Sequence, residues 1–294
     1  MKKKKKISVG GIVLNLVFIV LCLTYILPFM LLISISITDE AAISQFGYNL
    51  IPHKVSFEAY KQVFLSSGQL VNSYKTTILF SLMHTFLLVI VTTMTAYPLS
   101  RSNFKYKKQL TWYIFITMLF GGGLVPSYLV NTKFLHLGNT IWIYVFPGLM
   151  SAWNVIIVRT FFNGIPESLA EAAKIDGASE FYTFIKIMIP LSTPVMATIG
   201  FMSLIAKWND WNTALLYIKD TKLYSLQYML QRILREVEFV KSMASENPNF
   251  NQYELPTEGM RYATAILAAG PMIIVFPFFQ KYFTKGMTIG AVKG

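Results

Sequence analysis

The chain has 294 residues, of which 54% are hydrophobic and 14% are charged, and its formal net charge is +12. This composition is too apolar for a soluble domain of this length. Several apolar runs reach the roughly 20 residues that a helix needs to cross a bilayer, so the sequence predicts an all-α, polytopic membrane protein.

The first apolar segment runs from about Ile12 to Ile37 and follows a run of lysines. A signal peptide would have a shorter apolar core, of about 7–15 residues, and a small-residue cleavage site. The segment is therefore predicted to be a retained first span, with residues 1–10 as a basic, cytoplasmic N-terminus. Cys22 within it is the single cysteine, which excludes a disulfide framework and a cysteine-based metal site.

The second span is predicted from about Thr76 to Leu99, after a polar external connection at residues 39–72. The loop at 101–108 has four basic residues and no acid, which marks the cytoplasmic side. The third span, from about Leu110 to Val130, contains the triplet Gly121–Gly123 without a phosphate-loop motif. A broken or closely packed helix near the outer face is expected there. Non-helical backbone at that depth either packs against protein or lines a pathway, and both interpretations stay open.

The fourth span is predicted from about Thr140 to Phe162, with a bend at Pro147-Gly148. A polar loop at 163–194 follows, and then the fifth span, from about Leu191 to Ile218. The remaining segments are a partly helical extracytoplasmic loop, a sixth span and a cytoplasmic C-terminal tail, at residues 219–260, 262–279 and 284–294.

Six spans form a transmembrane domain over residues 11–283 and leave both termini in the cytoplasm. This topology puts 15 of the 26 Lys and Arg residues inside, but only four of the 14 acids. Basic residues are enriched in cytoplasmic loops of membrane proteins. The positive charge therefore indicates topology, and no nucleic-acid partner is expected.

The polar loop from Asn163 to Pro194 has the pattern of two short helices joined by a turn. Pro166 suits the first turn of a helix, and Asp176-Gly177 favours a reversal because glycine tolerates a positive φ. Ser179 can cap a second helix. Apolar residues then recur at helical spacing until Pro190 and Pro194 end the helix at the membrane edge; they are Phe181, Phe184, Ile185 and Met188.

This loop resembles the EAA loop of the membrane (permease) subunits of ATP-binding-cassette (ABC) importers. The resemblance rests on Glu171, Ala172, Ala173, Gly177, Ile187 and Pro190, and Asp176, Ala178, Phe184 and Pro194 make it similar to the carbohydrate-uptake branch. Ile189 stands where the family more often has leucine, which is a conservative departure. An ordinary amphipathic connecting loop is the alternative.

The resemblance implies that the loop docks into a cleft of an ATPase subunit and transmits its closure. The implied docking residues are Glu171, Ala172, Ala173, Asp176, Gly177, Ala178, Phe184, Ile187 and Pro190. The glycine-rich C-terminus, with Lys285, Gly286 and Gly290, also resembles the tail that reaches toward the ATPase pair in this family. A frayed terminus explains it equally well.

The implied assembly contains two ATPase subunits, a second homologous permease and an extracytoplasmic solute-binding protein, in the cytoplasmic membrane of a prokaryote. Its cargo would be a carbohydrate, and specifically an oligosaccharide, that crosses by alternating access. This chain would not itself be an enzyme and would bind no cofactor, because ATP and Mg²⁺ belong to the ATPases. Membrane lipid is its other partner.

The fifth span contains one polar and aromatic cluster, formed by Lys207, Trp208, Asn209, Asp210 and Trp211. Aromatic faces and hydrogen-bonding groups suit a sugar path, but interfacial anchoring and packing explain tryptophan as well. Lys207 can pair with Asp210, extend to the interface or meet an acidic sugar. The cluster is therefore a candidate translocation path.

The three histidines, His53, His84 and His136, show no ligand spacing, so no metal site is expected. No catalytic set is found either. Two alternatives remain: an ABC permease for a non-sugar solute, and an ATP-independent transporter or channel. An ATP-independent transporter usually needs an ionisable site at mid-bilayer. Asp210 is the only acid within a predicted span and is near its outer edge, which argues against this second alternative.

Overall fold

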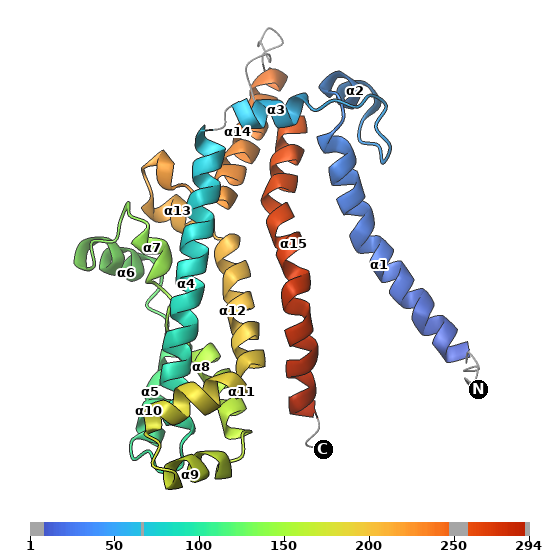
Figure 1. Cartoon of the computed structure of the whole chain (residues 1–294). Coiled ribbons are helices and arrows are strands. Elements are labelled where there is room, and N and C mark those ends of the chain that lie inside the picture. Colours follow the sequence, from blue (N-terminus) through green and yellow to red (C-terminus); the bar gives the residue numbers. More distant parts are fainter. Residues whose placement is uncertain (1–8, 66–67, 247–257, 292–294) are drawn as a thin grey trace. The chain divides into compact units, whose positions relative to one another are not determined.

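The computed structural model describes residues 9–65, 68–246 and 258–291. These residues fold into helices and connecting loops, with one isolated antiparallel bridge between Thr38 and Val55. In chain order the helices are α1 (Val9–Ser36), α2 (Glu40–Phe46), α3 (Glu58–Leu65), α4 (Gly68–Ser100), α5 (Lys107–Leu119), α6 (Leu124–Leu129), η1 (Val130–Phe134), α7 (Trp142–Val145), α8 (Ala152–Asn163), α9 (Ser168–Ile175), α10 (Glu180–Thr183), η2 (Phe184–Met188), α11 (Ile189–Leu191), α12 (Thr193–Trp208), α13 (Asn212–Tyr217), η3 (Thr221–Leu223), α14 (Leu226–Glu246) and α15 (Glu258–Ala291) (Figure 1).

The chain divides into two compact units. The first comprises Met1–Gly68 and Leu230–Gly270, and the second comprises Gln69–Met229 and Pro271–Gly294. Helices α14 and α15 each begin in one unit and end in the other. The predicted all-α fold of a polytopic membrane protein is confirmed.

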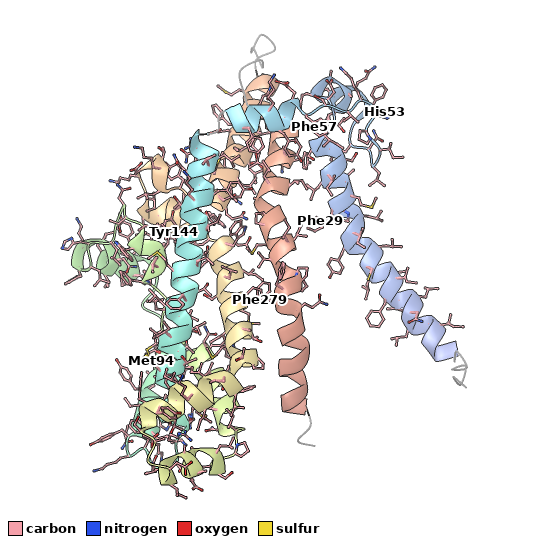
Figure 2. All side chains as sticks on the ribbon, viewed as in Figure 1. Phe29, His53, Phe57, Met94, Tyr144 and Phe279 are labelled. Carbon is pink, nitrogen blue, oxygen red and sulfur yellow. The ribbon has the colours of Figure 1, made fainter. Side chains whose placement is uncertain are left out.

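Three described helices are long and apolar enough to cross a membrane: α1, α4 and the first part of α15. Each of them has exposed apolar side chains, as expected for surfaces that face lipid; Phe29 of α1 and Met94 of α4 are 46% and 55% exposed (Figure 2). The number rises to five when two bent helix pairs are each counted as one span. These segments match the predicted first, second and sixth spans, and the bent pairs lie at the third and fifth.

The predicted break in the third span is confirmed. Helix α5 ends at Leu119, Gly123 adopts a φ of +82°, and the segment Leu124–Phe134 is bent by 111° from α5. Since glycine alone adopts this φ without strain, the triplet permits the chain to change direction. The second half therefore does not continue the course of α5.

The predicted fourth span is wrong as a single helix. It consists of two helices, α7 and α8, with six residues between them. These six residues include Pro147 and Gly148, and the φ of Gly148 is +82°. Ser151 then caps α8 by accepting a hydrogen bond from the backbone N–H of Asn154. The bend expected at Pro147-Gly148 is thus a complete interruption of the helix.

The helix that contains the sixth span extends beyond the predicted span at both ends. Helix α15 begins at Glu258 and runs to Ala291, so Lys285, Gly286 and Gly290 lie on helical backbone. The expected tail, 284–294, is therefore helical over most of its length, and residues 292–294 lie outside the described residues.

In the first unit, the connection between α1 and α3 folds against the start of α15. The Glu40 carboxylate accepts hydrogen bonds from the backbone N–H groups of Glu258 and Gly259, at 3.1 and 3.0 Å. Such a carboxylate is favoured at the positive N-terminal end of a helix. Lys54 hydrogen-bonds Asp39 beside it and lowers the pKa of that carboxyl.

The core of the second unit has two parts. One surrounds the stacked rings of Phe80 and Tyr144, whose centroids are 4.2 Å apart. The other contains buried residues from α4, α5, α8 and α12, together with Phe184 and Met188 from the loop at 163–194. The loop is therefore packed into the core of this unit and is not a loose connection.

Candidate functional site

The polar loop at 163–194 folds as a helix–turn–helix at one end of α4 (Figure 1). Helix α9 ends at Ile175, and Gly177 follows with a φ of +80°. The backbone N–H groups of Gly177 and Ala178 bond to the carbonyls of Lys174 and Ala173, at 3.1 and 2.9 Å. This pairing is the Schellman motif, which ends a helix and reverses the chain.

The second half of the loop begins at Ser179, whose hydroxyl accepts a hydrogen bond from the backbone N–H of Tyr182 at 3.1 Å. The predicted reversal at Gly177 and the predicted cap are both confirmed. Helical backbone then continues through η2 and α11 to Leu191. Pro190 does not end the helix, and Pro194 lies in the first turn of α12, which is bent by 76° from Glu180–Leu191.

The two halves of the loop enclose an open hollow of about 760 Å³. Its lining includes small residues that let the two helices lie close together, and also Tyr182 and Lys186. The lining consists of Leu169, Ala172, Ala173, Asp176, Gly177, Ala178, Ser179, Tyr182, Lys186 and Ile187. The hollow is thus built entirely from this loop, with its reversal at Gly177 in the wall.

The expected docking residues fall into two groups. Ala173 and Phe184 are buried, at 8% and 6% exposure, and Phe184 packs into the core of the unit. Ile187 is half-buried. The others present their surface outward or to the hollow; they are Glu171, Ala172, Asp176, Gly177, Ala178 and Pro190. Ile175 and Phe181 are also exposed, at 86% and 68%, so the loop carries apolar surface that a partner can cover.

Two hydrogen bonds connect the loop at 163–194 to α4 and to the residues that follow α4. The Tyr97 hydroxyl donates to Glu180 Oε2 at 2.8 Å, and the Ser102 hydroxyl donates to Glu167 Oε1. These contacts join residues 83 and 65 positions apart in the sequence. No local motif signals such a pair, so sequence reasoning did not find them.

The predicted path cluster lies where α12 ends, and its members have different surroundings. Trp208 is buried at 3% exposure, with its ring 6.5 Å from that of Tyr74. Asn209 is exposed and accepts a hydrogen bond from Gln227 at 3.3 Å, and Trp211 is half-buried. Trp208 therefore belongs to the packed interior, whereas Asn209 and part of Trp211 are open to the surroundings.

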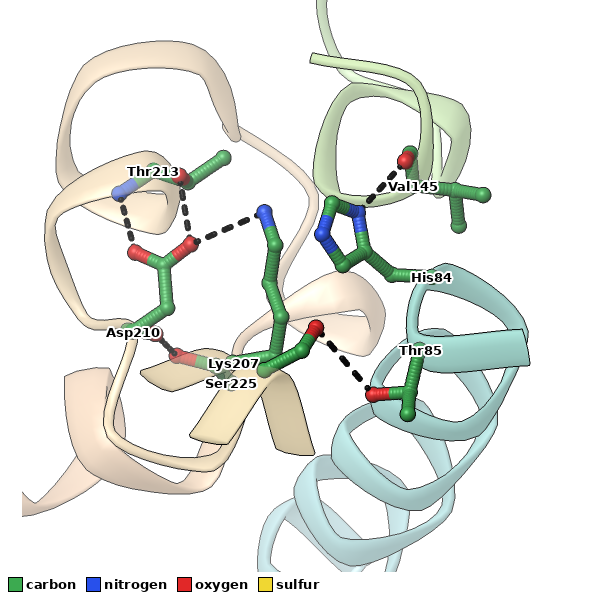
Figure 3. A network of polar contacts seen from close by, with 8 residues as sticks. His84, Thr85, Val145, Lys207, Asp210, Thr213 and Ser225 are labelled. Carbon is green, nitrogen blue, oxygen red and sulfur yellow. Dashed lines mark hydrogen bonds and ion pairs between the residues drawn. The ribbon is translucent and has the colours of Figure 1, made fainter. Parts of the chain in front are cut away.

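Asp210 has a structural role in this cluster. Its carboxylate accepts hydrogen bonds from the backbone N–H and the hydroxyl of Thr213, at 3.0 and 2.7 Å, at the start of α13 (Figure 3). Its carbonyl accepts a hydrogen bond from Ser225 at 2.8 Å. The spacing Asp-x-x-Thr before a helix is a capping signal that the sequence interpretation missed.

Lys207 is less completely paired. Its ammonium lies 3.9 Å from Asp210 Oδ2, and both side chains are largely buried, at 16% and 15% exposure. This distance exceeds that of a hydrogen bond. Among the described residues, Asp210 is the only acid paired with Lys207. Of the three alternatives considered for Lys207, the structure shows the pairing with Asp210, and the ammonium keeps donor capacity.

His84, on α4, lies near this network and is buried, at 3% exposure. Its Nδ1 bonds to the carbonyl of Val145 at 2.7 Å (Figure 3). The described ranges contain no group of three or more His, Cys, Asp or Glu side chains that could hold a metal ion.

The comparison with protein families agrees with the resemblance that the loop at 163–194 carries. Residues 5–289 match the family of binding-protein-dependent transport system inner membrane components. The chain belongs to this family. The permease resemblance predicted from the loop is thereby confirmed, and an ATP-independent carrier is not supported.

Individual relatives cover nearly the whole permease. It is 38% identical to protein LplC of Bacillus subtilis (strain 168), over 92% of this chain and 90% of that protein. It is 33% identical to the polygalacturonan/rhamnogalacturonan transport system permease protein YtcP of the same organism, over 95% of both chains.

A solved structure shares the fold of the permease. A chain in the crystal structure of a bacterial ABC transporter involved in the import of the acidic polysaccharide alginate superposes with a TM-score of 0.82 and 27% sequence identity. The match covers 96% of the permease and 99% of that chain. The permease is therefore a membrane subunit of an ABC importer.

Proposed function

We propose that this permease carries a carbohydrate across the membrane by alternating access, driven by ATPase subunits that bind the docking loop, residues 163–194. The observation that carries the proposal is the loop itself: a helix–turn–helix that Phe184 anchors in the core and that exposes Ala172, Gly177 and apolar side chains. A displacement of such a loop reaches the spans because the two are packed together.

The proposed assembly has two ATPase subunits, one on this loop and one on a second homologous permease, and a solute-binding protein on the opposite side. ATP and Mg²⁺ would be bound by the ATPases. The excess of basic residues at 2–6 and 101–108 supports a cytoplasmic loop and cytoplasmic termini. We also assign the end of α15, with Lys285, Gly286 and Gly290, to the side that faces the ATPases.

The carbohydrate assignment is supported by relatives whose names refer to sugars and polysaccharides, including YtcP and the alginate importer. The alginate importer takes up an acidic polysaccharide. Lys207 favours the same class here, because its ammonium is largely buried and only distantly paired. We therefore propose an oligosaccharide as cargo, and one that carries carboxylates as the more specific candidate.

Substitutions at Gly177 test the docking role. Gly177 has a φ of +80° and open space around its Cβ position, so a side chain there strains the backbone without a steric clash. Gly177→Val should reduce sugar uptake about tenfold or more, while Gly177→Asn, which tolerates this φ, should keep most of it. Uptake and ATP hydrolysis are measured in proteoliposomes that contain the complete importer.

Gly47, in the connection between α2 and α3, gives the matched control. It has a similar φ of +72° and also has nothing within 4 Å of its Cβ position, but it lies outside the docking loop. Gly47→Val should leave the ratio of sugar imported to ATP hydrolysed unchanged. Wild-type uptake by Gly177→Val would refute the docking role of the loop.

A further inference from the structure

Tyr97, near the end of α4, connects a membrane span to the docking loop. Its hydroxyl accepts a hydrogen bond from Arg101 Nη2 at 2.9 Å and donates one to Glu180 Oε2 at 2.8 Å. The Arg101 guanidinium also lies over the Tyr97 ring, 4.6 Å from its centroid. We call Arg101, Tyr97 and Glu180 the Tyr97 cluster.

The ring of Tyr97 is fixed as firmly as its hydroxyl. Tyr97 is 9% exposed, and its ring lies 6.3 Å from that of Phe162 and 5.0 Å from that of Phe184. Phe162 belongs to α8, which enters the docking loop, and Phe184 belongs to the loop. Tyr97 therefore meets the loop through both packing and a charge-assisted hydrogen bond, which is stronger and more directional than a neutral one.

The covalent connections of the docking loop lead to α8 and α12, and not to α4. A displacement of the loop can reach α4 only through noncovalent contacts. Glu180 lies in the first turn of α10, and Glu167 is the N-cap residue of α9. Each half of the helix–turn–helix is thus held at its N-terminal end by a hydroxyl from α4 or from the residues that follow it.

Apolar side chains alone would allow these surfaces to slide, because dispersion contacts have little directionality. A hydroxyl held by Arg101 on one side and bonded to Glu180 on the other fixes the distance between α4 and α10. We propose that Tyr97 is a positioning residue that makes α4 move together with the docking loop when the ATPases close. This inference rests on the proposed function and adds a residue and a third span to the coupling route.

The variant Tyr97→Phe removes both hydrogen bonds and keeps the ring contacts with Phe162 and Phe184. In the complete importer, reconstituted in proteoliposomes, it should assemble and hydrolyse ATP, while the sugar imported per ATP hydrolysed falls about fivefold or more. A fivefold change is the lower end of the usual coupling between two sites. A residue that only supported folding would lower uptake and ATP hydrolysis together.

Two further variants complete the design. Tyr106→Phe is the matched control, because Tyr106 is 55% exposed and contacts Phe104 and Lys105 instead of the loop; it should keep the wild-type ratio. Glu180→Gln keeps an acceptor oxygen for the Tyr97 hydroxyl and should give a ratio between those of wild type and Tyr97→Phe.

A wild-type ratio in Tyr97→Phe would overturn the inference. Glu180→Ala is measured in parallel, because it changes an exposed residue of the loop and provides a second test if Tyr97→Phe does not assemble. A reduced ratio of sugar imported to ATP hydrolysed in Glu180→Ala supports the inference, and a wild-type ratio refutes it. Failure of the proposed function would be distinct, since the wild-type chain itself would then bind no ATPase.

Discussion

Lys207 and Asp210 are two charged residues three positions apart with different surroundings. Asp210 has its carboxylate bonded twice to Thr213, so its place is fixed by the start of α13. Lys207 has its ammonium 3.9 Å from that carboxylate and largely out of solvent. An amine in this position can bind an anion at low cost, because its own partner does not saturate it.

This difference predicts the effect of Lys207→Gln. If the cargo carries carboxylates, the variant should take up an oligosaccharide of uronic acids about tenfold less well than wild type, and a neutral oligosaccharide about equally well. The physical reason is the loss of one partly desolvated charge pair, for which about 1–3 kcal/mol is reasonable. The change in preference is measured as the uptake of each sugar in competition with the other, in proteoliposomes that contain the complete importer.

Asp210→Asn is the matched control for that experiment. It removes the negative charge beside Lys207 and retains an oxygen for Thr213. If Lys207 serves only its ion pair with Asp210, the two variants should lose activity alike for both sugars. If Lys207 meets the cargo, Asp210→Asn should not lower uptake of the acidic sugar.

Residues with a special backbone conformation were predictable from sequence, and long-range partners were not. Gly177 and Ser179 carry their conformational preference in their own chemistry, so the reversal and the cap could be predicted at the correct positions. The partnership of Tyr97 with Glu180 depends on how distant segments pack. A single sequence contains no signal for it.

At the scale of elements, apolar runs predicted which segments are hydrophobic but not whether each is one helix. The run from Thr140 to Phe162 has no polar gap, yet the structure divides it into α7 and α8. Hydropathy measures the transfer of side chains and is insensitive to backbone φ, which changes sign at Gly148. The dipeptide Pro147-Gly148 was the only local sign of the interruption.

Gly148→Ala tests whether this interruption needs glycine. Gly148 has a φ of +82° and no atom within 4 Å of its Cβ position, so the cost of a methyl group there is backbone strain of about 1–2 kcal/mol. The melting temperature of the detergent-solubilised importer should fall. Gly121→Ala, also in open space but without a positive φ, should leave it unchanged. Equal melting temperatures for both variants would show that the φ at Gly148 is not required.

At the scale of the whole molecule, composition predicted the fold class and charge distribution predicted a topology. The prediction of six spans rests on the apolar runs, and the distribution of Lys and Arg was used to test the resulting topology; the described helices supply three long spans and two bent pairs. The glycine triplet predicted the break in the third span, whereas Pro147-Gly148 predicted only a bend where the structure has a complete interruption between α7 and α8. The position and internal architecture of the docking loop were predictable, since capping and glycine chemistry are local.

The most direct test of the account is to purify this permease from its native membrane in mild detergent and to identify the proteins that accompany it. We predict an ATPase subunit and a second permease in the complex, with a solute-binding protein recovered when its sugar is present. The Gly177→Val permease should carry less ATPase, because its docking loop is strained. A permease that is recovered alone, or only with copies of itself, would contradict the central claim that the loop at 163–194 couples it to an ATPase.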